Sequence, residues 1–470
     1  MTTESKTIRP SSLRTLQPRL TGEVVRPGDA EYEEARQVQI RVFDKKPALI
    51  VRAEDASDVI RAVLYARSNN LTIAVRGGAH SVAGFSTIDD GIVIDVSRMK
   101  GVRIDTASKT AWAQAGLKAG ELTAELEKFG FVIPTGDASS VGIAGLTLGG
   151  GIGYIAREHG LTIDHLIGVE LVTADGELLT ASESENSDLF WAIRGGGGNF
   201  GIVTAFQYSL IELPAVYGGA LIFPATVEVV RNYIAAAKAA PEGVTTIGHL
   251  MYAPPAPFVP EAVVGQPSLV IGVCFAGGPE EGAKAVAGLR AIGEATVDFL
   301  MPMPYSGMYA LAEEATKPHR AKVRQMFVDD LGDEAIETIV TRAAQSPSPM
   351  SMVQIRPLGG QMARVSPHAT AFKHRERELF VAVIGVWQEE FGPDDVHFDW
   401  ALGLWDQISH LRQGAYVNFV ELEGEERIRE TYGDETYARL ARVKAQYDPE
   451  NVFAQNQNIK PAVTAVEAAA

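Results

Sequence analysis

The chain has 470 residues, of which 46% are hydrophobic and 21% are charged, a composition typical of a globular protein long enough for two or three domains. Its formal net charge of −17 argues against nucleic acid or an anionic membrane as a partner. No apolar run is long enough to cross a bilayer, and the single cysteine, Cys274, excludes an intrachain disulfide and a cysteine-based zinc site. The polar N-terminus lacks the apolar stretch of a signal peptide, so we expect a cytoplasmic protein.

The first third of the chain alternates short strands with amphipathic helices. We expect residues 1–20 to be poorly ordered. Apolar runs and helical periodicity then predict strands at 48–52, 72–75, 92–96 and 110–115, with helices at 54–70 and 118–129. Asp55 or Ser57 is the expected N-cap of the first helix. This is a β-α-β arrangement followed by further short strands.

Two glycine-rich segments follow or interrupt these elements. The first, at 76–81, reads RGGAHS and comes directly after a predicted strand, and the second, at 142–153, reads GIAGLTLGGGIG. Glycine has no Cβ, so backbone N–H groups in such segments can approach a ligand closely. The second segment has too many glycines for a stable helix, which favours a backbone-lined wall against a flat or phosphate-bearing ligand. Taken singly, each segment is explained as well by a tight turn.

A third glycine cluster, GGGGNFG at 195–201, contains the G-x-G-x-x-G spacing of dinucleotide-binding loops. That fingerprint requires a strand before it and a helix after it. Here a helix is predicted at 188–193 and a strand at 202–210, so the order is reversed and a Rossmann NAD site is disfavoured. The chain also lacks a P-loop, a G-x-S-x-G elbow and a His-Glu-x-x-His pair, and its histidines are scattered along the sequence. The sequence therefore does not support a hydrolase or a metal site.

From about residue 215 the pattern changes to α+β. Strands are predicted at 219–223, 268–275 and 379–387, with helices at 227–239 and 280–291, which together indicate an antiparallel sheet backed by helices. The proline-rich stretches 254–257 and 301–304 predict loops, and a basic helix is predicted at 436–447. Cys274 falls within a predicted strand, where a core position is expected.

His80 is the chemically most suggestive residue of the glycine-rich segments. A loop histidine can simply cap a turn. A neutral imidazole nitrogen can also act as a nucleophile toward an electrophilic carbon. The residues alone leave both interpretations open.

Three ordered motifs connect these segments to a known family. They read RGGAHSVAGFSTIDDGIVIDVSRM, VGIAGLTLGGGIGYIAREHGLTIDHLIGVELVTADGE and DLFWAIRGGGGNFGIVT, and AFKHR, AYVNF and DPENVFAQNQNIKP follow toward the C-terminus. In this order they resemble the berberine bridge enzyme-like oxidases of the vanillyl-alcohol oxidase superfamily, with the hydroxynicotine oxidase branch nearest. The resemblance covers about residues 45 to 461.

The resemblance implies an α+β fold with a two-subdomain FAD-binding domain of the PCMH type and an α+β substrate domain whose antiparallel sheet is backed by helices. It places the FAD-binding domain at 21–214, the substrate-binding domain at 215–425 and a C-terminal segment returning to the FAD domain at 426–461. Residues 1–20 and 462–470 are expected to be flexible ends.

The resemblance also implies which residues bind FAD. By position, His80 corresponds to the histidine that bonds covalently to a flavin methyl carbon, and Ala138 stands where many relatives have a cysteine that makes a second bond. We therefore expect one covalent bond, through His80 only. The expected cofactor-binding residues are Arg76, Gly77, Gly78, Ala79, His80, Ser81, Gly84, Gly136, Ser140, Val141, Gly142, Gly145, Gly149, Gly150, Gly153, Tyr154, Gly201, Ile202, Val203, Tyr416, Asn456 and Asn458.

The catalytic base is left open by departures from the family pattern. Relatives that form alkaloids have a glutamate on the strand matching 379–387, which has no carboxylate here, and a histidine where Leu146 stands. A phenol is a usable base only if its surroundings lower its pKa. The polar candidates for catalysis are Tyr416 and Asn418 in the strand-like segment 415–419, Tyr154 and His374, with His159 and Tyr305 as further polar residues.

The function implied is an FAD-dependent oxidase that transfers hydride from an alcohol or amine C–H to flavin N5, with O₂ reoxidation giving H₂O₂. A small aromatic or heterocyclic substrate is expected. The alternatives are a dehydrogenase with another electron acceptor, a flavin-containing drug-binding or resistance protein, and a non-catalytic globular protein. The expected partners are the substrate and O₂, without nucleic acid or membrane; the oligomeric state is open.

Overall fold

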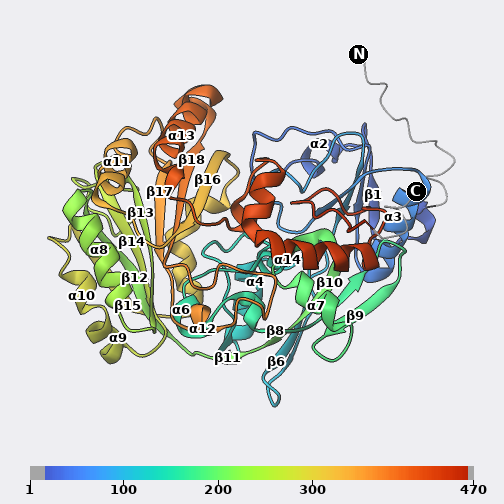
Figure 1. The fold of residues 1–470 in the computed structure, drawn as a ribbon, viewed down its shortest axis with the longest axis horizontal. Coiled ribbons are helices and arrows are strands. Elements are labelled where there is room, and N and C mark those ends of the chain that lie inside the picture. The colour runs from blue at the N-terminus through green and yellow to red at the C-terminus, as the bar shows by residue number, and fades with distance from the viewer. Residues whose placement is uncertain (1–15, 464–470) are drawn as a thin grey trace.

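The computed structural model describes residues 16–463, so most of the two predicted flexible ends lies outside the described residues. Figure 1 shows two halves side by side: a large sheet with its outer helices on the left, and a half built from smaller sheets on the right. The long C-terminal helix lies on the right-hand half. Between residues 16 and 463, no helix is both long and apolar enough to cross a membrane.

The right-hand half begins with a four-stranded sheet in the order β1-β2-β4-β3, in which β2, β4 and β3 are parallel. Its strands and its connecting helix are β1 (Glu23–Val25), β2 (Leu49–Arg52), α3 (Ala56–Ser68), β3 (Ile73–Arg76) and β4 (Ile92–Asp95). Asp55 caps α3 by accepting a hydrogen bond from the backbone N–H of Asp58. The strands and the helix predicted from residue 48 to residue 96 are confirmed.

A second, five-stranded antiparallel sheet follows, in the order β5-β6-β10-β8-β9. Its strands are β5 (Val102–Asp105), β6 (Thr110–Gln114), β8 (Leu166–Val172), β9 (Leu178–Ser182) and β10 (Ile202–Ser209), and the helices in this region include α4 (Ala119–Glu127) and α7 (Ser187–Ile193). The glycine cluster at 195–201 lies between α7 and β10. The predicted order of helix, glycine cluster and strand is therefore confirmed.

The second glycine-rich segment corrects a prediction. Residues Ile143–Gly149 form helix α5, although the glycine content argued against a helix. The glycines serve tertiary packing: a Cβ at Gly149 would overlap the Asn418 side chain, and one at Gly150 would lie 2.9 Å from the Phe372 ring. The loss of helix propensity is thus offset by contacts with segments far along the chain.

The left-hand half is a seven-stranded sheet in which every neighbouring pair is antiparallel. In spatial order its strands are β15 (Val297–Met303), β12 (Val216–Pro224), β14 (Pro267–Phe275), β13 (Val244–Tyr252), β17 (Met352–Pro357), β18 (Leu379–Trp387) and β16 (Arg320–Val328). Its outer face is covered by α8 (Val227–Ala239), α9 (Pro279–Ala285), α10 (Ala287–Arg290), α11 (Asp333–Ala343) and α13 (Asp394–Ile408) (Figure 1). The opposite face of the sheet is turned toward the right-hand half.

Three expectations for this region were wrong in detail. Residues 301–303 belong to β15 rather than to a loop; β15 is an edge strand, where Pro302 is tolerated. The helix expected at 280–291 is split into α9 and α10. The strand expected at 415–419 is an extended residue, Tyr416, followed by the 3-10 turn η7 (Val417–Phe419).

The C-terminal helix α14 (Glu425–Tyr447) is longer than the predicted helix at 436–447 and is kinked at Gly433, whose φ is 66°. Leu440 and Val443 of this helix share the apolar core of the right-hand half. Lys444 and Asp448 form an ion pair with Nζ–Oδ2 of 2.6 Å and no exposed side-chain surface. The segment after α14 is thereby fixed against the first half of the chain.

This buried pair leads to a stability prediction. Lys444 also donates to the carbonyls of Asn199 and Phe453, so Lys444→Met removes three hydrogen bonds and leaves a buried carboxylate without its cation. We expect the free energy of unfolding in urea to fall by about 3–5 kcal/mol. Lys460→Met is the control, because Lys460 pairs with Glu425 on the surface, and the two side chains are 62% and 63% exposed. Equal urea midpoints for the two variants would contradict the prediction.

Candidate active site

A cavity of about 1430 Å³ lies between the two halves. One side is formed by the glycine-rich segments and by the cluster at 195–201. The other side is the inner face of the seven-stranded sheet, and further lining residues come from 416–420 and from 453–457 of the C-terminal segment. The cavity therefore joins parts of the chain that are hundreds of residues apart.

The two glycine-rich segments touch each other in the wall of this cavity. A Cβ added to Gly78 would lie 2.7 Å from the Cα of Gly142, and one added to Gly142 would lie 2.9 Å from the Cα of Gly78. Both distances are too short for real carbon atoms, and the obstructing atoms belong to the backbone. The close approach therefore requires glycine at both positions.

The backbone after β3 offers a set of hydrogen-bond donors. The N–H groups of residues 77–81 make no hydrogen bond within the described part of the chain, and this stretch lines the cavity. Ala79 has a φ of 59°, a strained value for a residue with a side chain. Successive unpaired N–H groups in such a turn suit an anionic ligand such as a phosphate.

His80 faces the cavity from this turn. Its Nε2 lies 2.9 Å from the Ser140 Oγ, whereas its Nδ1 has no hydrogen-bond partner among residues 16–463. Burial, helped by the neighbouring His319 and Lys118, lowers the pKa of His80 to about 4. The imidazole is therefore neutral at pH 7. If the Nε2–H is donated to Ser140, then Nδ1 carries the lone pair of a nucleophile.

The residues expected at the cofactor divide into two groups. Those that line the cavity are Gly77, Gly78, Ala79, His80, Ser81, Gly136, Val141, Gly142, Gly145, Tyr154, Gly201, Ile202, Val203, Tyr416 and Asn456. Those that do not line it are Arg76, Gly84, Ser140, Gly149, Gly150, Gly153 and Asn458. Ser140 nevertheless contacts the cavity through its hydrogen bond to His80.

The residues of the second group are engaged elsewhere in the protein. The guanidinium of Arg76 donates to the Ser86 and Ala35 carbonyls and lies 3.6 Å from the Asp95 carboxylate. Gly84 and Gly153 make room for the Phe43 ring and the Thr135 backbone. The Asn458 Oδ1 is buried without a hydrogen-bond partner in the described chain. Most of these residues therefore shape the wall rather than face the space.

Tyr416 and Asn418 line the cavity but are largely occupied by structural contacts. The Tyr416 hydroxyl accepts hydrogen bonds from the Gly151 N–H at 2.9 Å and the Asn418 amide at 3.0 Å. Burial raises the pKa of Tyr416. A phenol with a raised pKa is a poor base at pH 7, so these contacts favour a role for Tyr416 in anchoring the segment after α5.

His374 lies outside the cavity. Its ring stacks on Phe327 with centroids 5.0 Å apart, and its Nε2 donates to the Thr431 carbonyl at 2.9 Å. Burial lowers the pKa of His374 to about 4. The structure therefore assigns this neutral histidine to packing between the halves rather than to the lining of the site.

Tyr154 is the remaining catalytic candidate, and it faces the cavity. The residue is 1% exposed, and its hydroxyl makes no hydrogen bond with residues 16–463. By contrast, the Tyr305 hydroxyl forms a hydrogen bond with the Thr135 hydroxyl. His159, like Tyr305, does not line the cavity.

A row of polar side chains crosses the inner face of the sheet, and no sequence motif predicted it. Gln354 Nε2 lies 2.9 Å from His249 Nε2, Arg356 Nε donates to Gln354 Oε1 at 2.6 Å, and Arg356 Nη2 lies 2.6 Å from the Asp137 Oδ2. All four residues line the cavity. They come from β13, β17 and the loop before α5, so the only local signal was a polar residue at alternate positions of two apolar strands.

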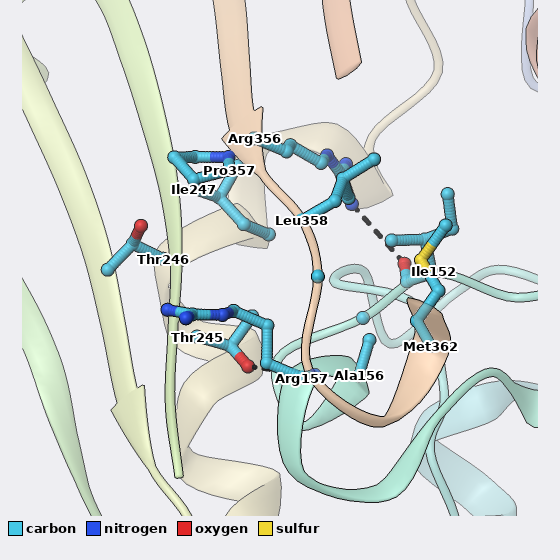
Figure 2. Close-up of a pocket in the computed structure, with 12 residues that line it drawn as sticks. Ile152, Ala156, Arg157, Thr245, Thr246, Ile247, Arg356, Pro357, Leu358 and Met362 are labelled. Atoms are coloured by element: carbon cyan, nitrogen blue, oxygen red, sulfur yellow. Dashed lines mark hydrogen bonds between the residues drawn. The ribbon is translucent and has the colours of Figure 1, made fainter. Parts of the chain in front are cut away.

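Figure 2 shows how the end of this row is fixed. Arg356 also donates to the carbonyl of Ile152 at 3.3 Å, which connects β17 to the segment after α5. A second, small cavity of about 10 Å³ lies beside Arg157, Thr245 and Met362, and Figure 2 draws the residues that line it. This space is sufficient for about one water molecule, so it is not a substrate site. No cluster of three metal-ligating side chains occurs among the described residues.

Two family models match the chain. A model described as an FAD binding domain matches residues 47–182, and one described as berberine and berberine like matches residues 415–460. An uncharacterised FAD-linked oxidoreductase of Bacillus subtilis is 33% identical over 462 residues, which cover 94% of this chain and 98% of that protein. (R)-6-hydroxynicotine oxidase of Paenarthrobacter nicotinovorans is 31% identical over 456 residues, covering 94% and 97%.

Solved structures share the whole architecture. The crystal structure of 6-hydroxy-D-nicotine oxidase from Arthrobacter nicotinovorans superposes with a TM-score of 0.84 at 29% identity, covering 94% of this chain and 98% of that one. Berberine bridge enzyme in complex with (S)-reticuline gives a TM-score of 0.86 at 23% identity, covering 96% and 98%. The second likeness shows the fold alone.

The fold, the cavity and these matches define an FAD-linked oxidoreductase. The chain belongs to the berberine bridge enzyme-like family. The resemblance drawn from the ordered motifs, the α+β fold class and the enzyme class are thereby confirmed.

The residues around the cavity fit FAD on physical grounds. Unpaired N–H groups at 77–81 suit a pyrophosphate, and the Asn456 Oδ1 is a buried acceptor without a partner in the described chain, next to the same space. The side chain at 138 is a buried methyl group. Cys274, whose predicted core position is confirmed, is fully buried in β14 and does not line the cavity.

Proposed function

We propose that the protein is an FAD-dependent oxidase that removes hydride from the alcohol or amine C–H of a small organic substrate and passes the electrons to O₂, giving H₂O₂. The observation that carries the proposal is the cavity of about 1430 Å³, which joins the glycine-lined wall to the inner face of the sheet. FAD supplies the hydride acceptor when bound. The substrate would enter between that acceptor and the sheet.

The first wall holds the cofactor in this proposal. The N–H groups of residues 77–81 would bind the pyrophosphate, and His80 Nδ1 would be the point of attachment for a methyl carbon of the flavin. That attachment would replace one C–H bond and the imidazole N–H bond with a C–N bond, and O₂ would be the oxidant that takes up the two protons and two electrons released. Ala138 provides no second attachment, because a methyl group has no nucleophile.

The sheet face determines the kind of substrate. Most side chains that it presents to the cavity are apolar; they include Met251, Val270, Met352, Ile384 and Val386. An apolar chamber with a few polar groups is typical of sites for drug-sized organic molecules. A carbohydrate would leave its hydroxyl groups without partners there. We therefore propose an aromatic or heterocyclic substrate.

The absorbance of the purified protein and a peroxide assay test this function. We expect visible flavin bands and, in a screen of aromatic and heterocyclic alcohols and amines, peroxide formed in amounts equal to the carbonyl or imine product. Turnover with a quinone but without peroxide would replace the oxidase with a dehydrogenase. Flavin bands without any turnover would favour a binding protein, and a colourless protein would exclude every flavin-based function.

A further inference from the structure

Tyr154 presents a hydrogen-bond donor that the protein itself does not use. Its side chain is almost wholly buried at 1% exposure, yet it lines the cavity and its hydroxyl has no partner within residues 16–463. The hydroxyl lies against Gly272 of β14, where an added Cβ would approach it to 2.9 Å. The hydroxyl is therefore available to a ligand in the cavity as a hydrogen-bond donor.

Asp137 presents an unused acceptor to the same cavity. Its Oδ2 is held by Arg356, while its Oδ1 accepts no hydrogen bond in the described chain, and the side chain is 25% exposed. Arg356 is itself fixed by Gln354 and the Ile152 carbonyl. The ion pair carries no net charge, so the site does not select a cationic ligand.

The Asp137 carboxylate and the Tyr154 phenol line the same cavity, and the charge of the carboxylate acts on the phenol. Burial and, to a lesser extent, the charge of Asp137 raise the pKa of Tyr154, so the phenol keeps its proton and can donate a hydrogen bond. Asp137 also interacts electrostatically with His249 on β13, Arg356 on β17 and Tyr309. Burial holds His249 neutral, with a pKa of about 4.

We propose that Tyr154 and Asp137 form the subsite for the hydroxyl group of a neutral, largely apolar alcohol: Tyr154 donates to the hydroxyl oxygen, and Asp137 Oδ1 accepts the hydroxyl proton. This assignment rests on the proposed oxidase function and narrows its substrate class from alcohols and amines to alcohols. A protonated amine has no lone pair, so it would give the Tyr154 O–H no acceptor for its proton.

The reaction balances with these two residues. The alcohol O–H proton moves to the Asp137 carboxylate, and the C–H hydride, with both electrons, leaves to the flavin. The carbon–oxygen bond becomes a carbonyl, whose oxygen keeps the hydrogen bond from Tyr154. O₂ takes the two electrons and, with two protons, becomes H₂O₂. Asp137 thus takes the place of the carboxylate that β18 lacks.

Binding of three matched probes to the flavin-loaded protein tests the subsite. 2-Naphthol can donate and accept a hydrogen bond, 2-acetonaphthone can only accept, and 2-ethylnaphthalene can do neither. Affinities are measured by titration calorimetry. We expect Tyr154→Phe to weaken the binding of naphthol and acetonaphthone roughly three- to tenfold and to leave the binding of ethylnaphthalene unchanged. Tyr305→Phe is the control, because Tyr305 is equally buried but its hydroxyl is bound to Thr135.

Asp137→Asn separates the acceptor from the donor. The new amide oxygen should turn toward Arg356 and the amide NH₂ toward the cavity. The affinity for naphthol should therefore fall about tenfold or more, while the affinity for acetonaphthone should not fall. Asp164→Asn is the control, because Asp164 forms another largely buried ion pair between the halves, with Arg375, and does not line the cavity. Loss of naphthol binding in both variants would assign the effect to domain packing and overturn the subsite.

Proton transfer is tested with an alcohol that is turned over in the peroxide screen. We expect Asp137→Asn to slow anaerobic flavin reduction by roughly a hundredfold or more. The inference is overturned if Asp137→Asn reduces its flavin as fast as the wild type, or if none of the three naphthalene probes binds. Retained flavin absorbance in the same preparations shows that the cofactor site is intact, so failure of the subsite is distinguishable from failure of the oxidase proposal.

Discussion

We expect acid-denatured wild-type protein to keep its flavin on the polypeptide and the His80→Ala variant to release all of it. The reason is the position of His80 at the cavity, with Nε2 next to Ser140 and Nδ1 without a partner in the described chain. Because burial lowers the pKa of His80 to about 4, the imidazole needs no prior deprotonation at pH 7. Flavin fluorescence of the denatured band after electrophoresis measures the attachment.

The control for this experiment is His368→Ala, an exposed histidine outside the cavity, which should keep the fluorescent band. A His80→Ala protein that still binds flavin before denaturation would separate attachment from binding. Release of the flavin from wild-type protein would rule out the covalent bond. A fluorescent band in the variant would assign the bond to another residue.

Gly78→Ala is expected to yield protein without flavin. The new methyl group would overlap the backbone of Gly142, and because the obstacle is backbone, relief requires the two glycine-rich segments to move apart. That movement displaces the N–H groups of residues 77–81 from the anion site. We expect more than tenfold weaker FAD retention, measured as the ratio of flavin to protein absorbance, and about 1–3 kcal/mol lower stability.

Gly288→Ala is the matched control, since a Cβ at that position in α10 meets no atom within 4 Å. It should bind flavin like wild type. Circular dichroism distinguishes a displaced wall from a failure to fold. A folded Gly78→Ala protein with full flavin content would show that the close contact is not needed for the site.

The elements that the sequence predicted well are those with a clear apolar period and clear end signals. α3 begins at its capping Asp55, and α8 has the predicted bounds. Helix propensity alone argues against α5. Its glycines are required instead by the close contacts of Gly149 with Asn418 and of Gly150 with Phe372. The first half of α14 was missed because Gly433 kinks the helix and interrupts its period.

In the candidate site, too, the features with a local sequence pattern could be predicted and those that depend on distant contacts could not. The glycine-rich wall and His80 were visible as local motifs, and the structure brings these two segments into contact. The polar row was not visible, because Asp137, His249 and Arg356 are separated by about a hundred residues or more and have no local pattern in common. Only the pairing of β13 with β17, and of the sheet with the first half, brings them together.

The C-terminal segment has a consequence for how the protein matures. Residues 453–457 contribute to the cavity, and their position depends on Lys444 at the end of α14. During synthesis the N-terminal glycine-rich wall leaves the ribosome long before these residues do. The cavity therefore stays open on one side until translation has passed residue 457. Capture of the flavin, and any bond to His80, should accordingly follow release of nearly the whole chain rather than accompany its elongation.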